Sequence, residues 1–361
     1  MKMVVWEMRC MVKARKILGK NEIMQMDYIN FMLEAAASSA RFGTITEWQP
    51  KGRFTTRANI NACLVMPFGS GKSTNLIQIK PEHCVKSNDM TFAGMIGTIS
   101  KDGDFNEGSI IKAAGKLLVV DEFQSLDDTA KNAMNSLLEY PHTYSRNLGF
   151  QVKHPIRQKG KYFSLRVEKG CIDLYCKFSC ITGGMYINKK NDVQKAWFSR
   201  FVPVVYNPTL DWYKKMTAGL TAMKINPQCH EGDFQFRNYM EFHADYWAAM
   251  GTDKFLLNYF DVHPRQTGYV ARNLQDVARL SCFIASLEGR QIIKKSDYLE
   301  ALKFRGLMLK NAILTSLTDV EMAILEHAEM SNSELALLTE TSIPNISQRR
   351  KELEEAGILF A

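Results

Sequence analysis

The chain has 361 residues, of which 46% are apolar and 23% charged, and its formal net charge is +8. At about 100–200 residues per domain this length predicts two or three domains, and the composition excludes an intrinsically disordered chain. No apolar run reaches the ~18–20 residues of a membrane span, and basic residues interrupt positions 1–20, so we expect an intracellular, cytoplasmic protein without membrane contact.

Residues 1–58 are predicted to form an N-terminal helical segment and a connection. Apolar residues recur at helical spacing as far as Ala37, whereas the polar stretch from Arg41 to Thr56 is typical of a connection. Residues 59–207 alternate short apolar runs with helical segments, which predicts buried parallel strands in an α/β domain. The runs are Ala62 to Met66, Lys116 to Val120, Lys177 to Ile181 and Phe201 to Tyr206.

Residues 208–314 have helical periodicity without a convincing strand, so we expect an all-α domain there. Residues 315–361 predict three short helices and a short apolar end, in the proportions of a helix-turn-helix. The expected helices are Val320 to Glu329, Ser333 to Leu338 and Ile346 to Ala356. Whether Arg349 and Arg350 of this small domain read DNA, or the domain binds a partner, stays open.

Three cysteines, Cys171, Cys176 and Cys180, lie close together in the chain. Their spacing does not match the paired ligands of a zinc site, and no histidine is adjacent. Burial in strands is therefore the favoured interpretation, with a metal site as the alternative.

A glycine-rich turn follows the first apolar run and precedes a helical pattern. Its sequence is Gly69-Ser70-Gly71-Lys72-Ser73-Thr74. Backbone N–H groups of such a turn surround phosphate oxygens, Lys72 can reach the β- and γ-phosphates, and the Ser73 hydroxyl can bind Mg²⁺. Met66 replaces the first glycine of the usual pattern. The strand–loop–helix context still favours an ATP-binding loop over an ordinary Gly-Ser turn.

A second apolar run ends in two acids, Asp121 and Glu122. An acid at the carboxyl end of a parallel strand faces the crevice where nucleotides bind. Asp121 would hold Mg²⁺, and Glu122 would orient and deprotonate the attacking water. The alternative is a solvated strand end.

These motifs resemble the AAA+ ATPases, and more narrowly the minichromosome-maintenance (MCM) helicase group. The resemblance extends from about Asn59 to Lys303 and includes residues 92–109, residues 270–281 and the stretch Trp197-Phe198-Ser199-Arg200-Phe201. It implies a P-loop NTPase core with a parallel sheet, an all-α lid and a small C-terminal winged-helix-like domain. Nothing in the chain resembles the large N-terminal DNA-binding domain of the family.

The resemblance also implies roles for three further residues. Thr182, placed after the strand Phe178 to Ile181, would be the sensor-1 residue. Arg200 would be the arginine finger, which reaches the nucleotide of the neighbouring subunit, and its alternative is a surface arginine in a loop. Arg272 would be the sensor-2 arginine, unless Asp276 forms an ion pair within the helix with Arg272 or Arg279.

Residues 150–170 carry six Lys or Arg against one acid. The turn Gln158-Lys159-Gly160-Lys161 predicts a hairpin, which the resemblance identifies with the pre-sensor-1 hairpin of MCM proteins. In a ring, Arg157, Lys159 and Lys161 would follow a DNA backbone without reading its sequence. The alternative is a solvated surface hairpin. A second hairpin, near Ser100 to Asp104, is less basic. A solvated surface hairpin is the favoured interpretation there, and a mechanical element is the alternative.

The sequence therefore predicts a ring-forming, hexameric ATPase that uses Mg²⁺ and couples hydrolysis at subunit interfaces to movement along single- or double-stranded DNA. Replication of a virus or mobile element is the setting that its size suggests. The alternative is a AAA+ switch or remodeller that acts on a protein partner, with the C-terminal domain as its docking element. A third reading is a ring subunit that binds ATP but scarcely hydrolyses it.

Overall fold

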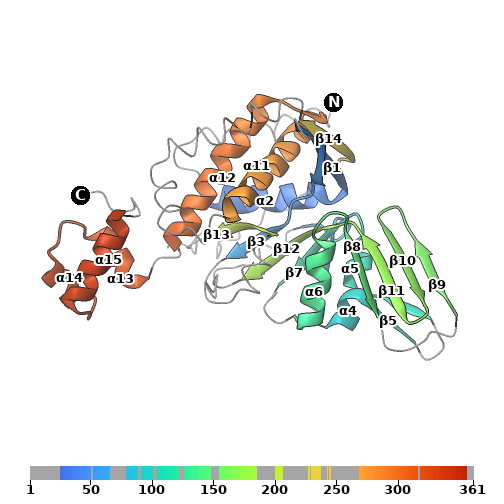
Figure 1. Ribbon diagram of the computed structural model, residues 1–361, viewed down its shortest axis with the longest axis horizontal. Coiled ribbons are helices and arrows are strands. Elements are labelled where there is room, and N and C mark those ends of the chain that lie inside the picture. The colour runs from blue at the N-terminus through green and yellow to red at the C-terminus, as the bar shows by residue number, and fades with distance from the viewer. Residues whose placement is uncertain are drawn as a thin grey trace.

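The computed structural model describes residues 25–49, 52–65, 79–87, 91–100, 104–121, 126–147, 154–184, 200–205, 227, 229–236, 242, 244, 268–315 and 318–355. Its centre is a mixed α/β body around a five-stranded sheet in which every neighbouring pair is parallel (Figure 1). The strands, in their spatial order, are β13 (Val202–Val205), β3 (Ala62–Val65), β12 (Ser179–Gly184), β7 (Leu117–Val120) and β4 (Cys84–Ser87).

Four of these strands are the predicted apolar runs, and their parallel pairing is confirmed. The fifth, β4, was not predicted. It has only four residues, of which Lys86 is exposed, so its hydrophobic pattern is too short to recognise.

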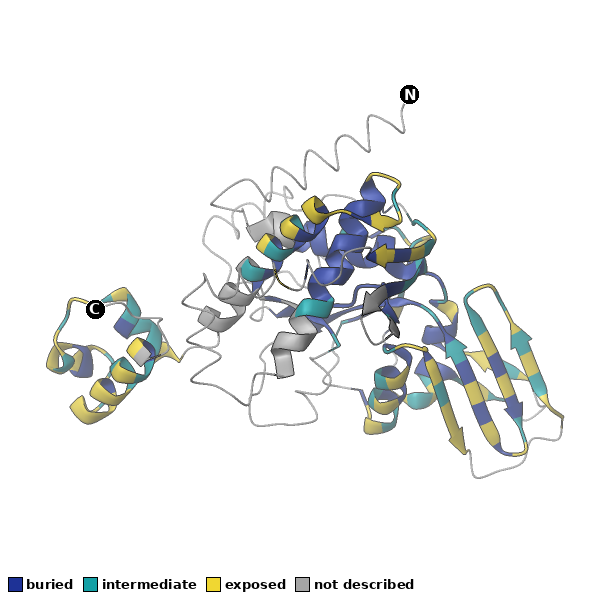
Figure 2. Ribbon diagram, turned by 45° about the horizontal axis from the view of Figure 1, so that its top comes forward, coloured by how far each residue is buried: buried dark blue, intermediate teal, exposed yellow. Residues whose placement is uncertain are grey.

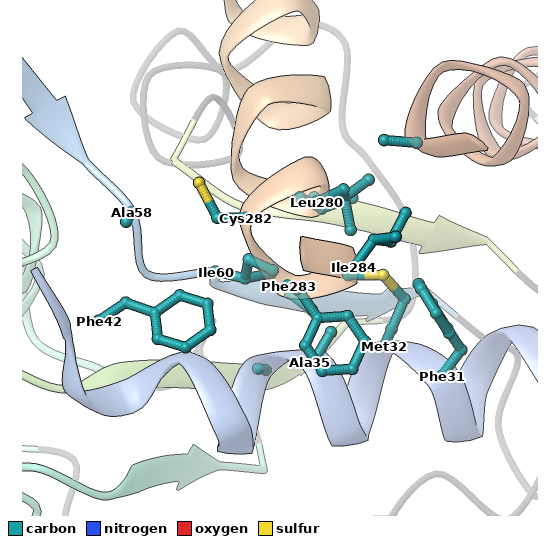
Figure 3. Close-up of a cluster of buried hydrophobic side chains, with 14 of the residues drawn as sticks. Phe31, Met32, Ala35, Phe42, Ala58, Ile60, Leu280, Cys282, Phe283 and Ile284 are labelled. Atoms are coloured by element: carbon teal, nitrogen blue, oxygen red, sulfur yellow. The ribbon is translucent and has the colours of Figure 1, made fainter. Parts of the chain in front are cut away.

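The two faces of this sheet pack into two separate cores, because successive side chains of a strand point to opposite faces. Ala62, Leu64 and Ile181 belong to one core, which α2 (Gln25–Ser38), α11 (Gly268–Leu287) and α12 (Lys295–Thr315) cover. Figure 3 shows Phe31 and Met32 of α2 against Phe283 and Ile284 of α11 in this core.

Three helices and an antiparallel sheet cover the opposite face. The helices are α4 (Phe92–Ile96), α5 (Ser109–Lys112) and α6 (Asp128–Leu137). The sheet has the order β8 (Thr143–Asn147), β11 (Cys171–Cys176), β10 (Phe163–Glu168) and β9 (Ile156–Lys159). We call it the insertion sheet, because it lies in sequence between α6 and β12. Buried and exposed residues alternate along β10 and β11, and Figure 2 shows this pattern. The predicted basic hairpin is confirmed as β9–β10.

A second four-stranded sheet corrects two predictions. Its order is β15 (Ile292–Ile293), β14 (Gly232–Phe236), β1 (Phe42–Gln49) and β2 (Gly52–Arg57). The predicted connection from Arg41 to Thr56 is thus wrong, and so is the expectation of no strand within 208–314. The physical reason is that β1 pairs with β14, about 190 residues later, where Thr44 N donates to Asp233 Oδ1 at 2.6 Å.

A short hairpin, β5 (Gly97–Ile99) with β6 (Phe105–Glu107), is present where the second hairpin was predicted. Residues 101–103 of its turn lie outside the described part of the chain. Ser100 N donates to Asp104 O at 2.7 Å across the base of this turn.

The C-terminal module, residues 318–355, consists of α13 (Asp319–Glu326), α14 (Asn332–Leu338) and α15 (Ile343–Glu355), as predicted. Capping boxes start α13 at Thr318 and α14 at Ser331. The module has its own small core and stands apart from the α/β body in Figure 1. The short apolar end near Ile358 lies outside the described residues. Within the described part of the chain, no helix is both long and apolar enough to cross a membrane.

Candidate functional site

The order of the parallel strands singles out the carboxyl end of β3. The chain leaves β3 for the edge strand β4, then returns through β7 and β12, and finally passes β3 to reach β13. The connection that leaves β3 therefore runs in the opposite direction to those that leave β7 and β12. Such a reversal creates a crevice outside the carboxyl ends of the strands, where ligands of open α/β sheets bind.

The predicted phosphate loop follows directly on this strand. Its residues Gly69 to Thr74 and the acid Glu122 lie outside the described residues, so their geometry stays a prediction. β3 itself covers Ala62 to Val65 of the predicted run, and Met66, the last residue of that run, lies outside the described residues.

Asp121 lies immediately after β7 and is half-buried. Val120, before it, pairs with Thr182 of β12. Gly183 then passes so close to Asp121 that a Cβ on Gly183 would lie 2.6 Å from the Asp121 carbonyl oxygen. A glycine is thus required for β12 to approach the acid at this distance, and the ends of β7 and β12 form one compact edge.

Thr182 lies inside β12 and not after it, which corrects its expected position. The strand continues to Gly184, and Thr182 pairs with Cys63 of β3 and Val120 of β7. Its side chain is fully buried, and its hydroxyl donates to the carbonyl of Gly183 at 3.4 Å. The assignment of Thr182 as the sensor-1 residue stays a prediction. β12 ends at Gly184, so residues that follow Gly184 are nearer than Thr182 in sequence to the position expected for that residue, directly after the strand.

Arg200 is held against α6 by contacts within its own chain. Its Nε lies 3.5 Å from Glu139 Oε1 and donates to the carbonyl of Asn135 at 3.1 Å. Its own carbonyl accepts a hydrogen bond of 2.8 Å from the buried Arg57. The guanidinium is therefore partly buried and paired. The alternative prediction for Arg200, a surface arginine in a loop, would leave the side chain exposed.

Arg272 lies in α11, as predicted, but its side chain is outside the described residues. The predicted alternative is confirmed for Arg279, whose Nη1 lies 3.1 Å from Asp276 Oδ1. Arg305 of α12 contacts the second oxygen of Asp276 at 3.3 Å. All three side chains are buried, so this Arg–Asp–Arg cluster joins the two helices rather than facing a ligand.

The three basic residues of the hairpin have different surroundings. Lys159, at the end of β9, is exposed and has no ion pair among the described residues. Arg157 Nη2 lies 3.2 Å from Glu168, and Lys161 Nζ lies 2.7 Å from Glu231. The hydrogen bond from Lys161 also lowers the pKa of Glu231. Local sequence could not reveal this acid, because it lies 70 residues away.

Arg349 and Arg350 of α15 face their own module. Arg349 Nη1 lies 3.0 Å from Glu352 and 3.4 Å from Glu321, whereas Arg350 Nη2 donates to the carbonyls of Ala328 and Met330. These contacts stabilise the three-helix arrangement, and they leave less charge for a DNA backbone.

Two of the clustered cysteines, Cys176 and Cys180, are buried as predicted, and burial raises the pKa of each thiol. Cys171 is exposed on β11. In the described ranges, no group of three His, Cys, Asp or Glu side chains is placed to hold a metal ion.

A scan against protein-family models found no match for the chain, and a search of curated proteins found no similar sequence.

Proposed function

We propose that the chain is an ATP-hydrolysing, ring-forming DNA motor that resembles the MCM replicative helicases. The observation that carries this proposal is the order of the parallel sheet. In this order β3, the strand that precedes Gly69 to Thr74, lies next to β12. The connections that leave β3 and β12 run in opposite directions, and this reversal lies at the carboxyl end of β3. A phosphate-binding sequence at the position where α/β sheets bind ligands is the combination expected of a nucleotide site.

The residues fit a magnesium nucleotide. Asp121 offers a carboxylate at the same edge, and Ser73 offers a hydroxyl, both of which are hard oxygen ligands. Gly183 allows the end of β12 to pack directly against the backbone of Asp121, which fixes this acid at the edge of the sheet. Ser73 and Asp121 are thus the residues that would hold Mg²⁺, whose chemistry is to neutralise charge on the phosphate oxygens.

The remaining steps belong to side chains of the protein. Lys72 and the loop N–H groups bind the phosphates, and Glu122 accepts a proton from the attacking water. Arg200 of a neighbouring subunit stabilises the charge that develops on the phosphoryl oxygens. This role requires the guanidinium to leave Glu139, whose Oε1 lies 3.5 Å from Arg200 Nε.

The DNA contact is proposed for the tip of β9–β10. Residues 143–177, which contain the insertion sheet, carry eight Lys or Arg and two acids. Such an excess of basic residues attracts a phosphate backbone irrespective of sequence. Lys159 is the leading contact residue, since Arg157 and Lys161 each have an acidic neighbour.

A protein-remodelling AAA+ switch is the second candidate, and the same ion pairs favour it. If Lys161 stays bound to Glu231, the hairpin tip has little charge to offer to DNA. In that case the C-terminal module would recruit a protein partner.

Steady-state ATPase activity, with and without single- or double-stranded DNA, distinguishes the two candidates. We expect DNA to stimulate the wild type and Lys159→Ala/Lys161→Ala to lose that stimulation. Lys169→Asn is the matched control, because Lys169 is exposed in the turn at the other end of β10 and asparagine tolerates its positive φ of 50°. This variant should keep the stimulation.

Arg200→Ala tests the shared site. The variant should lose about 10³-fold or more of the ATPase rate, and mixing with Lys72→Ala subunits should restore part of it, since each mutant supplies what the other lacks. Robust ATPase activity without a response to any DNA would contradict the motor and support the protein switch.

A further inference from the structure

The C-terminal module exposes apolar side chains. The described residues include six large apolar side chains that are exposed, and three of them belong to this module. They are Leu337, Leu338 and Ile343, with 83%, 52% and 51% exposure. All three lie where α14 ends and α15 begins, so we call them the apolar corner. Clustered apolar exposure of this kind is typical of an interaction site.

The surroundings of the apolar corner are acidic. Residues 318–355 contain nine Asp or Glu and three Lys or Arg, so the module has a net charge of −6 within a chain of +8. Glu334 and Glu340 are exposed on either side of the two leucines in the sequence. Two of the three cations, Arg349 and Arg350, contact groups of the module itself: Arg349 pairs with Glu321, and Arg350 donates to the carbonyl of Met330. This charge repels a nucleic acid and suits a basic partner.

One segment of this chain has the complementary chemistry. Residues 1–20, which lie outside the described part, contain six Lys or Arg and one Glu among apolar residues. At helical spacing their basic residues share one face, with the apolar residues on the others. The basic face comprises Lys2, Arg9, Lys13, Lys16 and Lys20.

We propose that the C-terminal module docks residues 1–20 of this chain, with the apolar corner against their apolar side chains and Glu334 and Glu340 against their basic face. The two parts have opposite charges of similar size, −6 against +5. Each contains apolar side chains, and docking would bury them. This docking requires neither ATP hydrolysis nor DNA binding.

Site-specific photo-crosslinking in the full chain tests this docking. A benzoylphenylalanine at position 338 should give crosslinked peptides that map within residues 1–20. The control position is Gln348, which is exposed on α15 and lies about 140° around that helix from Ile343. A probe there should give at least fivefold less of this crosslink. Mixing isotope-labelled with unlabelled chains reports whether the segment comes from the same copy or from a second copy.

A charge exchange separates docking from a change in folding. Glu334→Gln/Glu340→Lys keeps a capping side chain at position 334 and should reduce the crosslink at least fivefold. Lys13→Glu/Lys16→Glu should have the same effect. The four changes together should restore the crosslink, because the charge at position 340 is again opposite to the charges at positions 13 and 16. Crosslinks that map mainly elsewhere, no crosslink at all, or no recovery in the combined variant would overturn the proposal.

Discussion

His142 follows the end of α6 and is buried, and its Nδ1 lies 2.9 Å from the carbonyl oxygen of Leu137. Burial lowers its pKa from the ordinary 6.5 to about 4, and the hydrogen bond to Leu137 opposes this shift only in part. The fold therefore holds a neutral imidazole at a position where the chain enters the insertion sheet at Thr143.

A single residue thus makes stability depend on pH. The unfolded chain binds a proton at His142 near pH 6.5 and the native chain does not until about pH 4, so this stabilisation is complete above pH 6.5 and is lost as the pH falls to 4. The loss amounts to about 3 kcal/mol at about 1.4 kcal/mol per pKa unit.

His142→Asn should reduce the pH dependence of the unfolding free energy by that amount, because asparagine does not titrate and accepts the φ of 63°. Urea unfolding of both proteins at pH 7, 6, 5 and 4 measures the difference. Parallel pH profiles for the two proteins would contradict the assignment.

At the scale of elements, a buried charge cluster joins the two long helices. Asp276 of α11 forms ion pairs with Arg279 of its own helix and with Arg305 of α12. Arg279 also donates to the carbonyl of Arg57, the last residue of β2, at 3.4 Å. Arg57 in turn donates to the carbonyl of Arg200. These contacts connect the helices over the sheet to the segment that precedes β13.

Asp276→Asn should destabilise the protein by about 3–5 kcal/mol, because it leaves two buried guanidinium groups without their common counter-charge. Asp128→Asn is the control, since Asp128 is 93% exposed and its pair with Lys131 should be worth less than about 1 kcal/mol. Chemical denaturation of both variants measures this. Equal effects would show that the cluster adds little to the joining of α11 and α12.

At the scale of the whole molecule, the α/β body and the C-terminal module differ in charge and have separate cores. The module core consists of Ile324, Leu335, Ala336, Ile346 and Leu353, and all of them come from α13, α14 and α15. A module of 38 residues with so small a core is expected to have a low free energy of unfolding.

Leu335→Ala should therefore unfold the module alone. Truncation of a fully buried leucine costs about 2–5 kcal/mol, whereas Leu337→Ala on the same helix removes an 83% exposed side chain and should cost less than about 0.5 kcal/mol. Amide hydrogen exchange should increase within 318–355 in the first variant only. A simultaneous increase in β3, β7 and β12 would show that the module and the body unfold together.

The strands differ in how well the sequence alone predicts them. β3, β7, β12 and β13 were predictable because each is a short apolar run, and β3 and β7 are buried on both faces. β9–β10 was predictable from its turn. β1 and β14 were not predicted, because each is polar on one face and forms a strand by pairing with a partner about 190 residues distant. Non-local pairing leaves no mark within a short window of sequence.

For the candidate site, the sequence by itself determined the residue types: a glycine-rich phosphate loop, an acid after an apolar strand and a basic hairpin. Only the tertiary structure decided which strand ends are neighbours, that Thr182 is enclosed within β12, and that Lys161 and Arg200 have acidic partners in Glu231 and Glu139. The reason is physical. A motif's chemistry resides in its own side chains, whereas burial and charge pairing depend on whatever the fold brings beside them.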